Sequence, residues 1–165
     1  MTAKPVEPIR LAWEDRWNPP TFEQLMEPQK EQHQALLHTL LERLEAYEGV
    51  EKAIIWHGSA WKWTLEYTLT TDGGPTSEPM AYFVPDPESP VFCMPFREEM
   101  IELLPMKRLN RYIRDGIRGA KCAVQIHWCK WSPTAMTEVE HLTDLIKRKH
   151  KILTGQTKPT KKAAG

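Results

Sequence analysis

Hydrophobic and polar residues alternate most regularly in the middle of the chain, over residues 61–70. The hydrophobic members of this alternation are Trp61, Trp63, Leu65, Tyr67 and Leu69. A period of two places successive side chains on opposite faces of a β-strand. The pattern therefore predicts a strand with one buried face, and with Lys62, Glu66 and Thr68 exposed on the other face.

Shorter apolar runs predict four more strands. They cover residues 51–57, 80–84, 91–94 and 122–129. Gly58 and Ser59 separate the first of these runs from the long alternation, and they suit the turn of a hairpin. Because strands joined by short turns pair in the antiparallel sense, we predict a mainly antiparallel sheet of five strands.

Apolar residues at helical spacing predict helices before and after these strands. The predicted helices cover residues 28–48, 96–104, 105–118 and 133–153. Gly49 is predicted to end the first helix, because glycine readily adopts the conformation that follows a helix C-terminus. Ser132 and Pro133 are predicted to begin the last helix as its N-cap and first helical residue. The apolar stripe of that helix consists of Met136, Val139, Leu142, Leu145, Ile146 and the stem of Lys149.

The predicted order of elements is α-β-β-β-β-α-α-β-α, which indicates an α+β fold. We predict a two-layer sandwich with helices packed on one face of the sheet. Residues 21–153 form a single domain in this prediction. Residues 1–20 contain four prolines and are predicted to form an extended N-terminal arm, which Trp13 and Trp17 dock on the core. Residues 154–165 lack an apolar pattern and are predicted to be a disordered basic tail.

Composition narrows the class of protein. The chain has 165 residues, of which 41% are hydrophobic, and its formal net charge is zero. This length suits one domain, and this charge balance excludes a wholly basic nucleic-acid module and an acidic disordered chain. No apolar run approaches the roughly 20 residues of a membrane helix, and the N-terminus lacks the apolar stretch of a secretory signal. Three cysteines without a CxxC pair are typical of reduced thiols, so we predict a cytoplasmic protein.

Charge is distributed unevenly along the chain. Seven of the 22 lysines and arginines lie in residues 147–165, which contain no acidic residue, so residues 1–146 carry a net charge of −7. Basic tails often contact polyanions. Nucleic acid is therefore one candidate partner of the basic tail, but we favour a solvated chain end, and we expect no membrane partner.

Four segments of the sequence resemble small bacterial domains of unknown function that have a YdhG-like fold. The segments are EKAIIWHGSAWKWTLEYTL, AYFVPD, KCAVQIHWCKW and EVEHLTDLIKRKHKIL. The resemblance covers about residues 28–153 and rests on the order of elements and the placement of aromatic residues. It implies an α+β fold and a cytoplasmic location. Some YdhG-like relatives are proposed to be iron chaperones of the frataxin type, which implies metal handling as an alternative function, although no metal-binding motif of theirs matches this sequence.

Aromatic residues are concentrated in the predicted sheet. The set consists of Trp56, Trp61, Trp63, Tyr67, Tyr82, Trp128 and Trp131. Such rings form either a pocket for a flat or apolar ligand, or the core between the sheet and the helices, and we favour the core. The alternative interpretation selects five tryptophans as ligand-binding residues and places Trp131 at the mouth of the pocket. These residues are Trp56, Trp61, Trp63, Trp128 and Trp131.

His57, His127 and Cys129 are the candidate metal ligands. His127 and Cys129 are two residues apart and therefore share one face of a strand. A metal site needs three or four converging ligands, and local spacing brings together only these two, so a buried histidine in the sheet is the simpler interpretation. A catalytic pair formed by Cys93 or Cys129 with one of the two histidines also stays open.

Four cations of the helix predicted at residues 105–118 share one helical face. They are Lys107, Arg111, Arg114 and Arg118. This stripe is either an anion-binding surface or a solvated face that glutamates of the preceding helix neutralise, and we favour the second interpretation. The glutamates are Glu98, Glu99 and Glu102.

Sequence motifs for catalysis are absent. The chain contains no GxSxG, HExxH, P-loop or GxGxxG motif, so we expect neither an enzyme nor a bound cofactor. The sequence predicts a small cytoplasmic binding or interaction domain with a Trp-rich sheet face, whose partner is an unknown small molecule or protein. The alternatives are metal handling, and nucleic-acid association through the basic tail and the arginine stripe.

Overall fold

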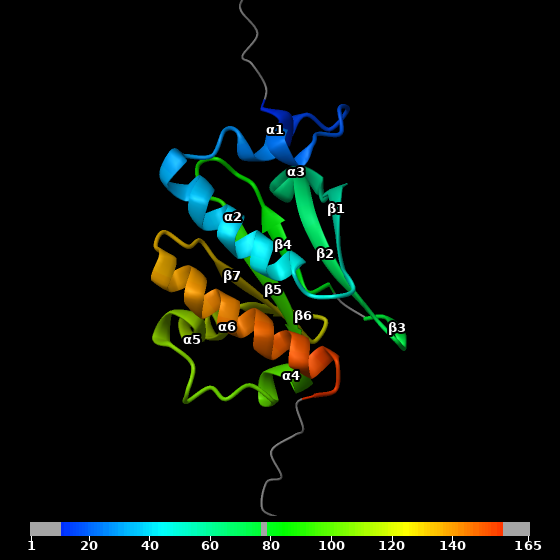
Figure 1. Ribbon diagram of the computed structural model, residues 1–165, viewed down its shortest axis with the longest axis vertical. Coiled ribbons are helices and arrows are strands. Elements are labelled where there is room, and N and C mark those ends of the chain that lie inside the picture. Colours follow the sequence, from blue (N-terminus) through cyan, green and yellow to red (C-terminus); the bar gives the residue numbers. More distant parts are fainter. Residues whose placement is uncertain (1–10, 77–78, 157–165) are drawn as a thin grey trace, which may run out of the picture.

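An antiparallel sheet of seven strands is the centre of the computed structural model, which describes residues 11–76 and 79–156 (Figure 1). The strand order is β1-β2-β4-β5-β7-β6, and β3 pairs with β2 beside this path. The strands are β1 (Val50–Trp56), β2 (Trp63–Thr71), β3 (Gly74–Pro75), β4 (Ala81–Val84), β5 (Val91–Arg97), β6 (Lys121–Ala123) and β7 (Ile126–Trp131). The predicted antiparallel sheet is confirmed, but the predicted number of five strands is wrong.

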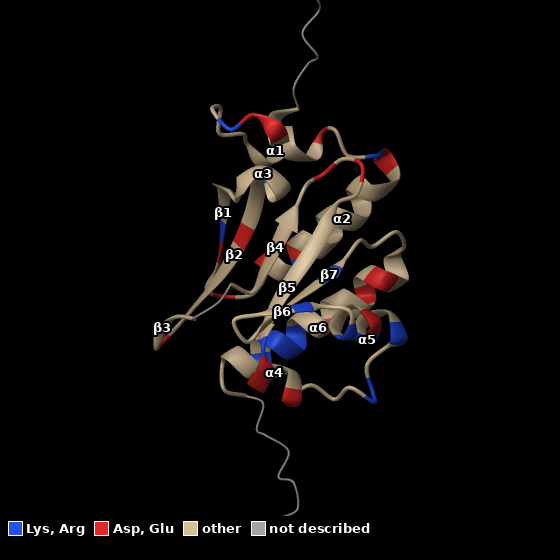
Figure 2. Cartoon of the chain, turned by 180° about the vertical axis from the view of Figure 1, so that it is seen from behind, with Lys and Arg blue, Asp and Glu red and all other residues tan. Residues whose placement is uncertain are grey.

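Helices pack against this sheet, which confirms the α+β class. They are the 3-10 helix η1 (Ala12–Glu14), α1 (Phe22–Met26), α2 (Glu31–Glu45), α3 (Gly58–Trp61), α4 (Glu98–Glu102), α5 (Arg111–Arg118) and α6 (Met136–Leu153). The two long helices, α2 and α6, lie side by side across one face of the sheet (Figure 1). Figure 2 shows the molecule from behind, where the strands face the viewer. None of the described helices is long and apolar enough to cross a lipid bilayer.

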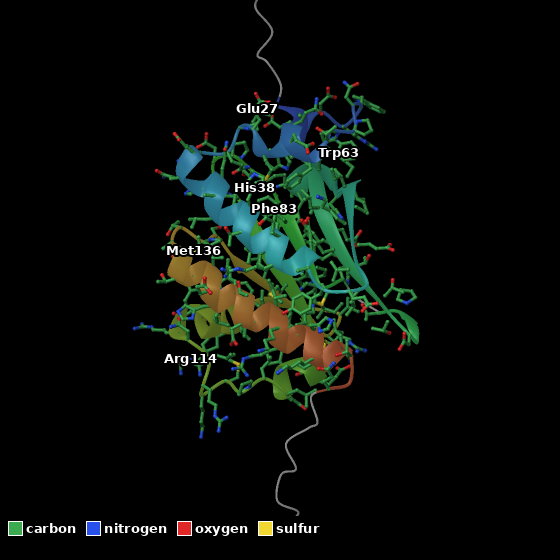
Figure 3. The ribbon with its side chains drawn as sticks, in the orientation of Figure 1. Glu27, His38, Trp63, Phe83, Arg114 and Met136 are labelled. Carbon is green, nitrogen blue, oxygen red and sulfur yellow. The ribbon has the colours of Figure 1, made fainter. Side chains whose placement is uncertain are left out.

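The alternation in β2 determines which side chains enter the core. Trp63, Leu65, Tyr67 and Leu69 are buried, as predicted. The Tyr67 hydroxyl contacts Glu45 Oε1 of α2 at 3.1 Å, so these side chains point to the face of the sheet that the helices cover. Figure 3 labels Trp63 near the end of the molecule that carries α1.

The opposite side of β2 differs from the prediction. Thr64 is fully buried, whereas Lys62, Glu66 and Thr68 are partly buried rather than exposed. The Lys62 ammonium lies 4.4 Å from the centre of the Trp13 ring in η1, and the Glu66 side chain is hydrogen-bonded to Tyr82 of β4. Sequence alternation could not reveal this covering, because it comes from residues outside β2.

Helix boundaries differ from the prediction at α4, which covers Glu98–Glu102 rather than residues 96–104 because β5 extends to Arg97, and at three further places. The first long helix begins at Glu31, and a separate short helix, α1, precedes it with Thr21 as its N-cap. The second difference is at α5, which begins after Asn110 instead of at residue 105, because the Asn110 side chain accepts a hydrogen bond from the Tyr112 amide. The third is at α6, where Ala135 occupies the N-cap position that was predicted for Ser132.

Gly49 lies in the turn between α2 and β1 rather than at the C-cap of α2, which is Ala46. Its φ angle of +84° and its position against β2 both require glycine, since a Cβ atom there would lie 2.3 Å from the Thr70 carbonyl oxygen. The glycine therefore permits the turn between α2 and β1 to lie directly against the backbone of β2.

The predicted strand at residues 122–129 is a hairpin, which explains one of the additional strands. Val124 and Gln125 connect β6 to β7 and have φ angles of +53° and +63°. Two consecutive residues with positive φ form the kind of tight turn that normally requires asparagine or glycine. The sequence contains neither residue at this turn, so its pattern looks like one continuous strand.

Lys149 anchors α6 to the sheet. Its side chain is fully buried, and its Nζ atom donates hydrogen bonds to the carbonyl oxygens of Pro79, Met80 and Pro95. The distances to the Pro79 and Met80 oxygens are 2.8 Å and 3.0 Å. The predicted apolar stripe of α6 is thus buried except at Met136, and its last member adds a cation that links the helix to β5 and to the start of β4.

The N-terminal segment is partly described. Trp13 is buried, and its Nε1 donates a hydrogen bond to the Trp61 carbonyl oxygen at 2.9 Å, whereas the Trp17 side chain is 79% exposed. Docking of this segment by Trp13 is confirmed, and docking by Trp17 is wrong. Residues 1–10 of the predicted arm and residues 157–165 of the predicted basic tail lie outside the described part of the chain.

Candidate functional site

The sheet face opposite α2 and α6, hereafter the outer face, carries a row of four paired residues. Strand register places Glu66 opposite Tyr82, Tyr82 opposite Cys93, and Cys93 opposite Lys130. Since neighbours in register point to the same side of a sheet, this row crosses the outer face from β2 to β7. Trp128 is two residues from Lys130 on β7 and therefore shares this face.

Four rings gather on the outer face in what we call the outer aromatic cluster, which consists of His57, Trp61, Tyr82 and Trp128. The Tyr82 ring lies 5.4 Å from the centres of both the His57 and the Trp61 rings. The Trp128 ring lies 5.9 Å from that of Tyr82 and 6.3 Å from that of Trp61. Most of these contacts are edge-to-face, which is a favourable arrangement of aromatic rings.

Local backbone geometry brings Trp61 to this cluster. The helical turn α3 separates β1 from β2, beginning at Gly58 with a φ of +88° and ending at Lys62 with a φ of +58°. Trp61 therefore leaves the strand alternation to which it was assigned and lies over the strands instead. The Lys62 amide donates a hydrogen bond to the Gly58 carbonyl oxygen at 2.8 Å and closes the turn.

Burial under the cluster controls the acid–base chemistry of the outer face. Tyr82 is 7% exposed, and this burial is the main reason why the pKa of its hydroxyl is raised to about 12. The charge of Glu66 and its hydrogen bond to Tyr82 raise this pKa further. Cys93 is buried and pairs with Tyr82 in the strand register, and burial raises the pKa of its thiol to about 12. On the helix-covered face, burial likewise raises the pKa of Cys129 to about 12. Both thiols therefore stay protonated at neutral pH, which makes them poor nucleophiles.

Two lysines and a small pocket adjoin the cluster. The Lys130 ammonium lies 5.5 Å from the centre of the Trp61 ring, and Lys121 is opposite Trp128 in the strand register. Both lysine side chains are exposed. A pocket of about 260 Å³ is lined by Asp115, Gly116, Gly119, Ala120, Lys121, Trp128 and Lys130. One wall of this pocket is thus an indole ring, and two cations lie beside it.

The structure separates the five tryptophans that the ligand-binding interpretation selects. Trp61 and Trp128 belong to the outer aromatic cluster. Trp63 and Trp131 are buried on the helix-covered face, and their Nε1 atoms donate to the carbonyl oxygens of Asp15 and Tyr112. Trp56 pairs with Trp63 and contacts its ring edge at 5.6 Å between centres. These three tryptophans do not line the pocket beside Trp128.

His57, Tyr82 and Lys130 were not among the ligand-binding residues that we selected from the sequence. Strand alternation alone places Lys130 on the same face as Trp128, so this signal was available. His57 and Tyr82 need the pairing of β1, β2 and β4, which the sequence does not contain.

The three candidate metal ligands are not brought together. His57 belongs to the outer aromatic cluster, whereas His127 and Cys129 pair with Phe96 and Met94 on the helix-covered face. Within residues 11–76 and 79–156, no group of three or more histidine, cysteine, aspartate and glutamate side chains is arranged to hold a metal ion. The Nε2 atom of His57 is buried and has no hydrogen-bond partner in this part of the chain.

The predicted cationic stripe is divided by the start of α5. Lys107 lies in the turn before this helix, whereas Arg111, Arg114 and Arg118 belong to it (Figure 3 labels Arg114). Arg111 forms an ion pair with Asp115, with 3.6 Å between Nε and Oδ2. The acceptor is thus a residue of the same helix rather than a glutamate of α4, and Glu99 instead pairs with Arg97.

A larger pocket, of about 640 Å³, lies between the end of β2 and the end of α6. Its lining includes Glu48, Asp72 and His150, and burial lowers the pKa of His150. None of the site residues selected from the sequence lines this pocket, and it contains no tryptophan.

Comparison with known proteins identifies no relative of the chain: no family model matches it, and neither a curated protein nor a solved structure matches it. The resemblance to YdhG-like domains therefore stays a prediction. Any function has to be argued from the geometry of the described residues.

Proposed function

We propose that this chain is a binding domain whose outer aromatic cluster, with the adjoining pocket, holds a small planar anion. The observation that carries the proposal is the position of Trp128, which lies between the cluster and two lysines in the lining of one pocket. An indole offers a flat apolar wall, and Lys121 and Lys130 supply charge-assisted hydrogen bonds for a carboxylate or phosphate. Pockets that combine apolar walls with a few polar groups are typical of small-molecule sites.

The sign of the ligand's charge follows from the groups around the pocket. The Lys130 ammonium already lies beside the Trp61 ring, and its positive charge disfavours a second cation there. Asp115 is the acidic residue of the lining, and Arg111 lies 3.6 Å from its carboxylate. The two lysines are therefore the charges available to a ligand, and they favour an anion.

Metal handling has less support. The candidate ligands His57, His127 and Cys129 lie on different faces of the sheet, and both buried thiols are held protonated by burial. A metal site needs deprotonated thiolates or several neutral imidazoles that converge on one point. The cysteine–histidine pairs considered for catalysis have little support for the same reason, since a protonated thiol is a poor nucleophile.

A matched set of three small ligands tests the proposal. Benzoate, benzamide and benzylammonium share one ring and differ in charge. We expect benzoate to shift the indole NMR signal of Trp128 in a saturable manner, benzamide to bind more weakly, and benzylammonium to have no effect. The Trp17 indole, which is 79% exposed and belongs to the N-terminal segment, is the internal control.

Variants complete the test. Lys121→Gln should weaken benzoate binding by roughly tenfold, the value of one charge-assisted hydrogen bond. Because Lys121 is exposed, this variant should fold normally. Lys30→Gln, which removes another exposed cation outside the pocket, should bind like the wild type. Equal shifts for all three ligands, or a benzoate effect that survives Lys121→Gln, would contradict the proposal.

A further inference from the structure

One side of β1 has no partner strand in the described part of the chain. All seven residues of β1 pair with β2, and β1 stands at the end of the strand order. Figures 1 and 2 both show this strand at one margin of the sheet. The free side of an edge strand exposes backbone N–H and C=O groups that can pair with a strand of another chain.

Two hydrogen bonds show which backbone groups of β1 point away from β2. The Thr70 amide donates to the Gly49 carbonyl oxygen at 2.9 Å, just before β1 begins. The His57 amide donates to the Lys62 carbonyl oxygen, also at 2.9 Å, just after β1 ends. Because hydrogen-bonded and non-hydrogen-bonded pairs alternate along an antiparallel ladder, the odd-numbered residues of β1 bond to β2. The even-numbered residues therefore direct their backbone groups to the free side, and they are Val50, Lys52, Ile54 and Trp56.

The features that normally protect an edge strand are absent from β1. Natural edges are blocked by prolines, by bulges or by lysines that project from the strand. β1 contains no proline, and its register with β2 runs without a bulge. Its one lysine, Lys52, is held against the helix-covered side, where its ammonium lies 4.0 Å from the centre of the Phe22 ring and 3.3 Å from Glu45 Oε1. On the outer face, Ala53 is exposed and Ile55 is 38% exposed, so this edge is apolar.

We propose that the free side of β1 pairs with β1 of a second copy of this chain, in an antiparallel dimer whose two-fold axis passes through Ile54. In this register Ile54 is opposite its own copy, and Lys52 is opposite the partner's Trp56. All three residues direct their N–H and C=O groups to the free side, so each pair exchanges two hydrogen bonds. The two sheets then form one continuous sheet, with α2 and α6 of both copies on the same face.

Side chains in this register are complementary on both faces of the sheet. On the helix-covered face, the Lys52 ammonium approaches the indole ring of the partner's Trp56, which is a favourable pairing of a cation with an aromatic ring. On the outer face, the exposed Ile55 is opposite the partner's Ala53, so the two apolar side chains shield each other from water.

Neighbouring registers fit less well. An axis through Lys52 places two lysines directly opposite each other, where like charges repel. An axis through Ala53 requires the Val50 amide, which already donates a hydrogen bond to a carbonyl oxygen of the preceding turn. It also places the charge of Lys52 opposite the partner's Ile54 instead of an aromatic ring. Charge complementarity and the free backbone groups therefore select the axis at Ile54.

The other edge of the sheet favours a closed dimer over a fibre. That edge is β6, which has three residues and carries the exposed Lys121. Short and charged edges pair poorly with other strands. Pairing of two identical β1 edges leaves only the β6 edges free, so assembly stops at two copies.

Sedimentation of the full chain from about 1 µM to about 1 mM, a range that covers weak self-association, tests the dimer. Lys52→Pro is the test variant, because the Lys52 amide points to the free side and proline is tolerated at such positions of edge strands. Lys52→Ala is the matched control, since it removes the same side chain and keeps the amide. We expect the wild type to dimerise as its concentration rises. Lys52→Pro should dimerise at least about tenfold more weakly than Lys52→Ala, because two backbone hydrogen bonds are lost per dimer.

Disulfide cross-linking tests the register. The variants are Ala53→Cys and Ile55→Cys, each in a chain that also carries Cys122→Ser, because Cys122 is exposed. The two new thiols are opposite each other in a non-hydrogen-bonded pair, where Cα atoms are about 4.5 Å apart and a disulfide fits. We expect an oxidised mixture of the two variants to contain more linked heterodimers than random collision gives, as measured by mass spectrometry.

Three outcomes would overturn the inference. The first is a wild type that stays monomeric at all concentrations, which is also the result if another segment of the chain or a different protein pairs with β1. The second is equal dimerisation of Lys52→Pro and Lys52→Ala. The third is a mixture whose cross-links have the proportions of random collision. Neither experiment changes Lys121 or Trp128, so the result is independent of the benzoate test.

Discussion

The indole ring of Trp131 lies directly against Gly116 and joins α5 to β7. Its Nε1 donates a hydrogen bond to the Tyr112 carbonyl oxygen at 3.1 Å, one helical turn before the glycine. A Cβ atom built on Gly116 would lie 2.1 Å from this same nitrogen. The absence of a side chain at residue 116 is therefore what permits the tryptophan of the strand to contact the backbone of the helix.

Gly116→Ala should destabilise the protein even though alanine favours helices by about 1 kcal/mol over glycine. The indole would have to move and lose its hydrogen bond, so we expect a net loss of about 2–4 kcal/mol in the free energy of unfolding. Urea denaturation measures this loss. Gly73→Ala is the control, because the nearest atom to its Cβ would be 3.9 Å away. Equal stabilities of the two variants would show that the contact is not tight.

Substitutions in the turn between β6 and β7 should, by contrast, stabilise the protein. Val124 and Gln125 both have positive φ, a backbone conformation that is especially unusual for a β-branched residue such as valine. Replacing them with asparagine and glycine, respectively, supplies the residues that this type of turn prefers and should stabilise the protein by about 1–2 kcal/mol. Thermal unfolding should show a higher midpoint for the double variant. An unchanged or lower midpoint would contradict the positive φ angles.

Lys149→Met should be strongly destabilising. Methionine matches the length of the buried stem, but it leaves the carbonyl oxygens of Pro79, Met80 and Pro95 without the ammonium donor. We expect a loss of about 3–5 kcal/mol in the free energy of unfolding, as for other buried charge networks that lose one partner. Lys147→Met, two residues earlier on the exposed side of the same helix, should change it by less than about 0.5 kcal/mol.

Thiol reactivity should distinguish the three cysteines. Cys122 is exposed, whereas Cys93 and Cys129 are buried and have their pKa values raised to about 12. At pH 8 a chromogenic thiol reagent should modify Cys122 rapidly and the other two only after denaturation. Raising the pH to 10 should leave this difference intact, because burial moves ionisation of the folded thiols to higher pH. Rapid reaction of two or three thiols in the folded protein would contradict their burial.

The raised pKa values of Cys93 and Cys129 also predict how the stability of the protein depends on pH. As the pH rises above the ordinary thiol pKa, the unfolded chain releases protons that folded Cys93 and Cys129 retain. Stability should therefore fall as the pH rises from about 9 towards 12. Cys93→Ala should make this fall less steep, since one of the contributing thiols is then absent.

Local sequence pattern predicts the buried side chains correctly where a single periodicity runs through an element. The alternation from Trp63 to Leu69 identified the buried side of β2, and the apolar spacing in α6 identified its buried stripe as far as Lys149. Local sequence pattern does not predict the position of a side chain where the backbone changes direction. Trp61 continued the alternation in the sequence, but the turn at Gly58 assigns it to a helical turn above the outer face.

The α+β class, the antiparallel pairing of neighbouring strands and the buried face of β2 can be predicted from local sequence pattern, because each of these depends on residues close together in the chain. The folded arrangement of the strands is needed to see that Trp61, Tyr82 and Trp128 share one cluster while Trp63 and Trp131 enter the core. That division depends on strand order and on side chains of other elements. Register between strands distant in sequence, such as β5 and β7, brings the candidate binding residues together, and no local periodicity encodes that register.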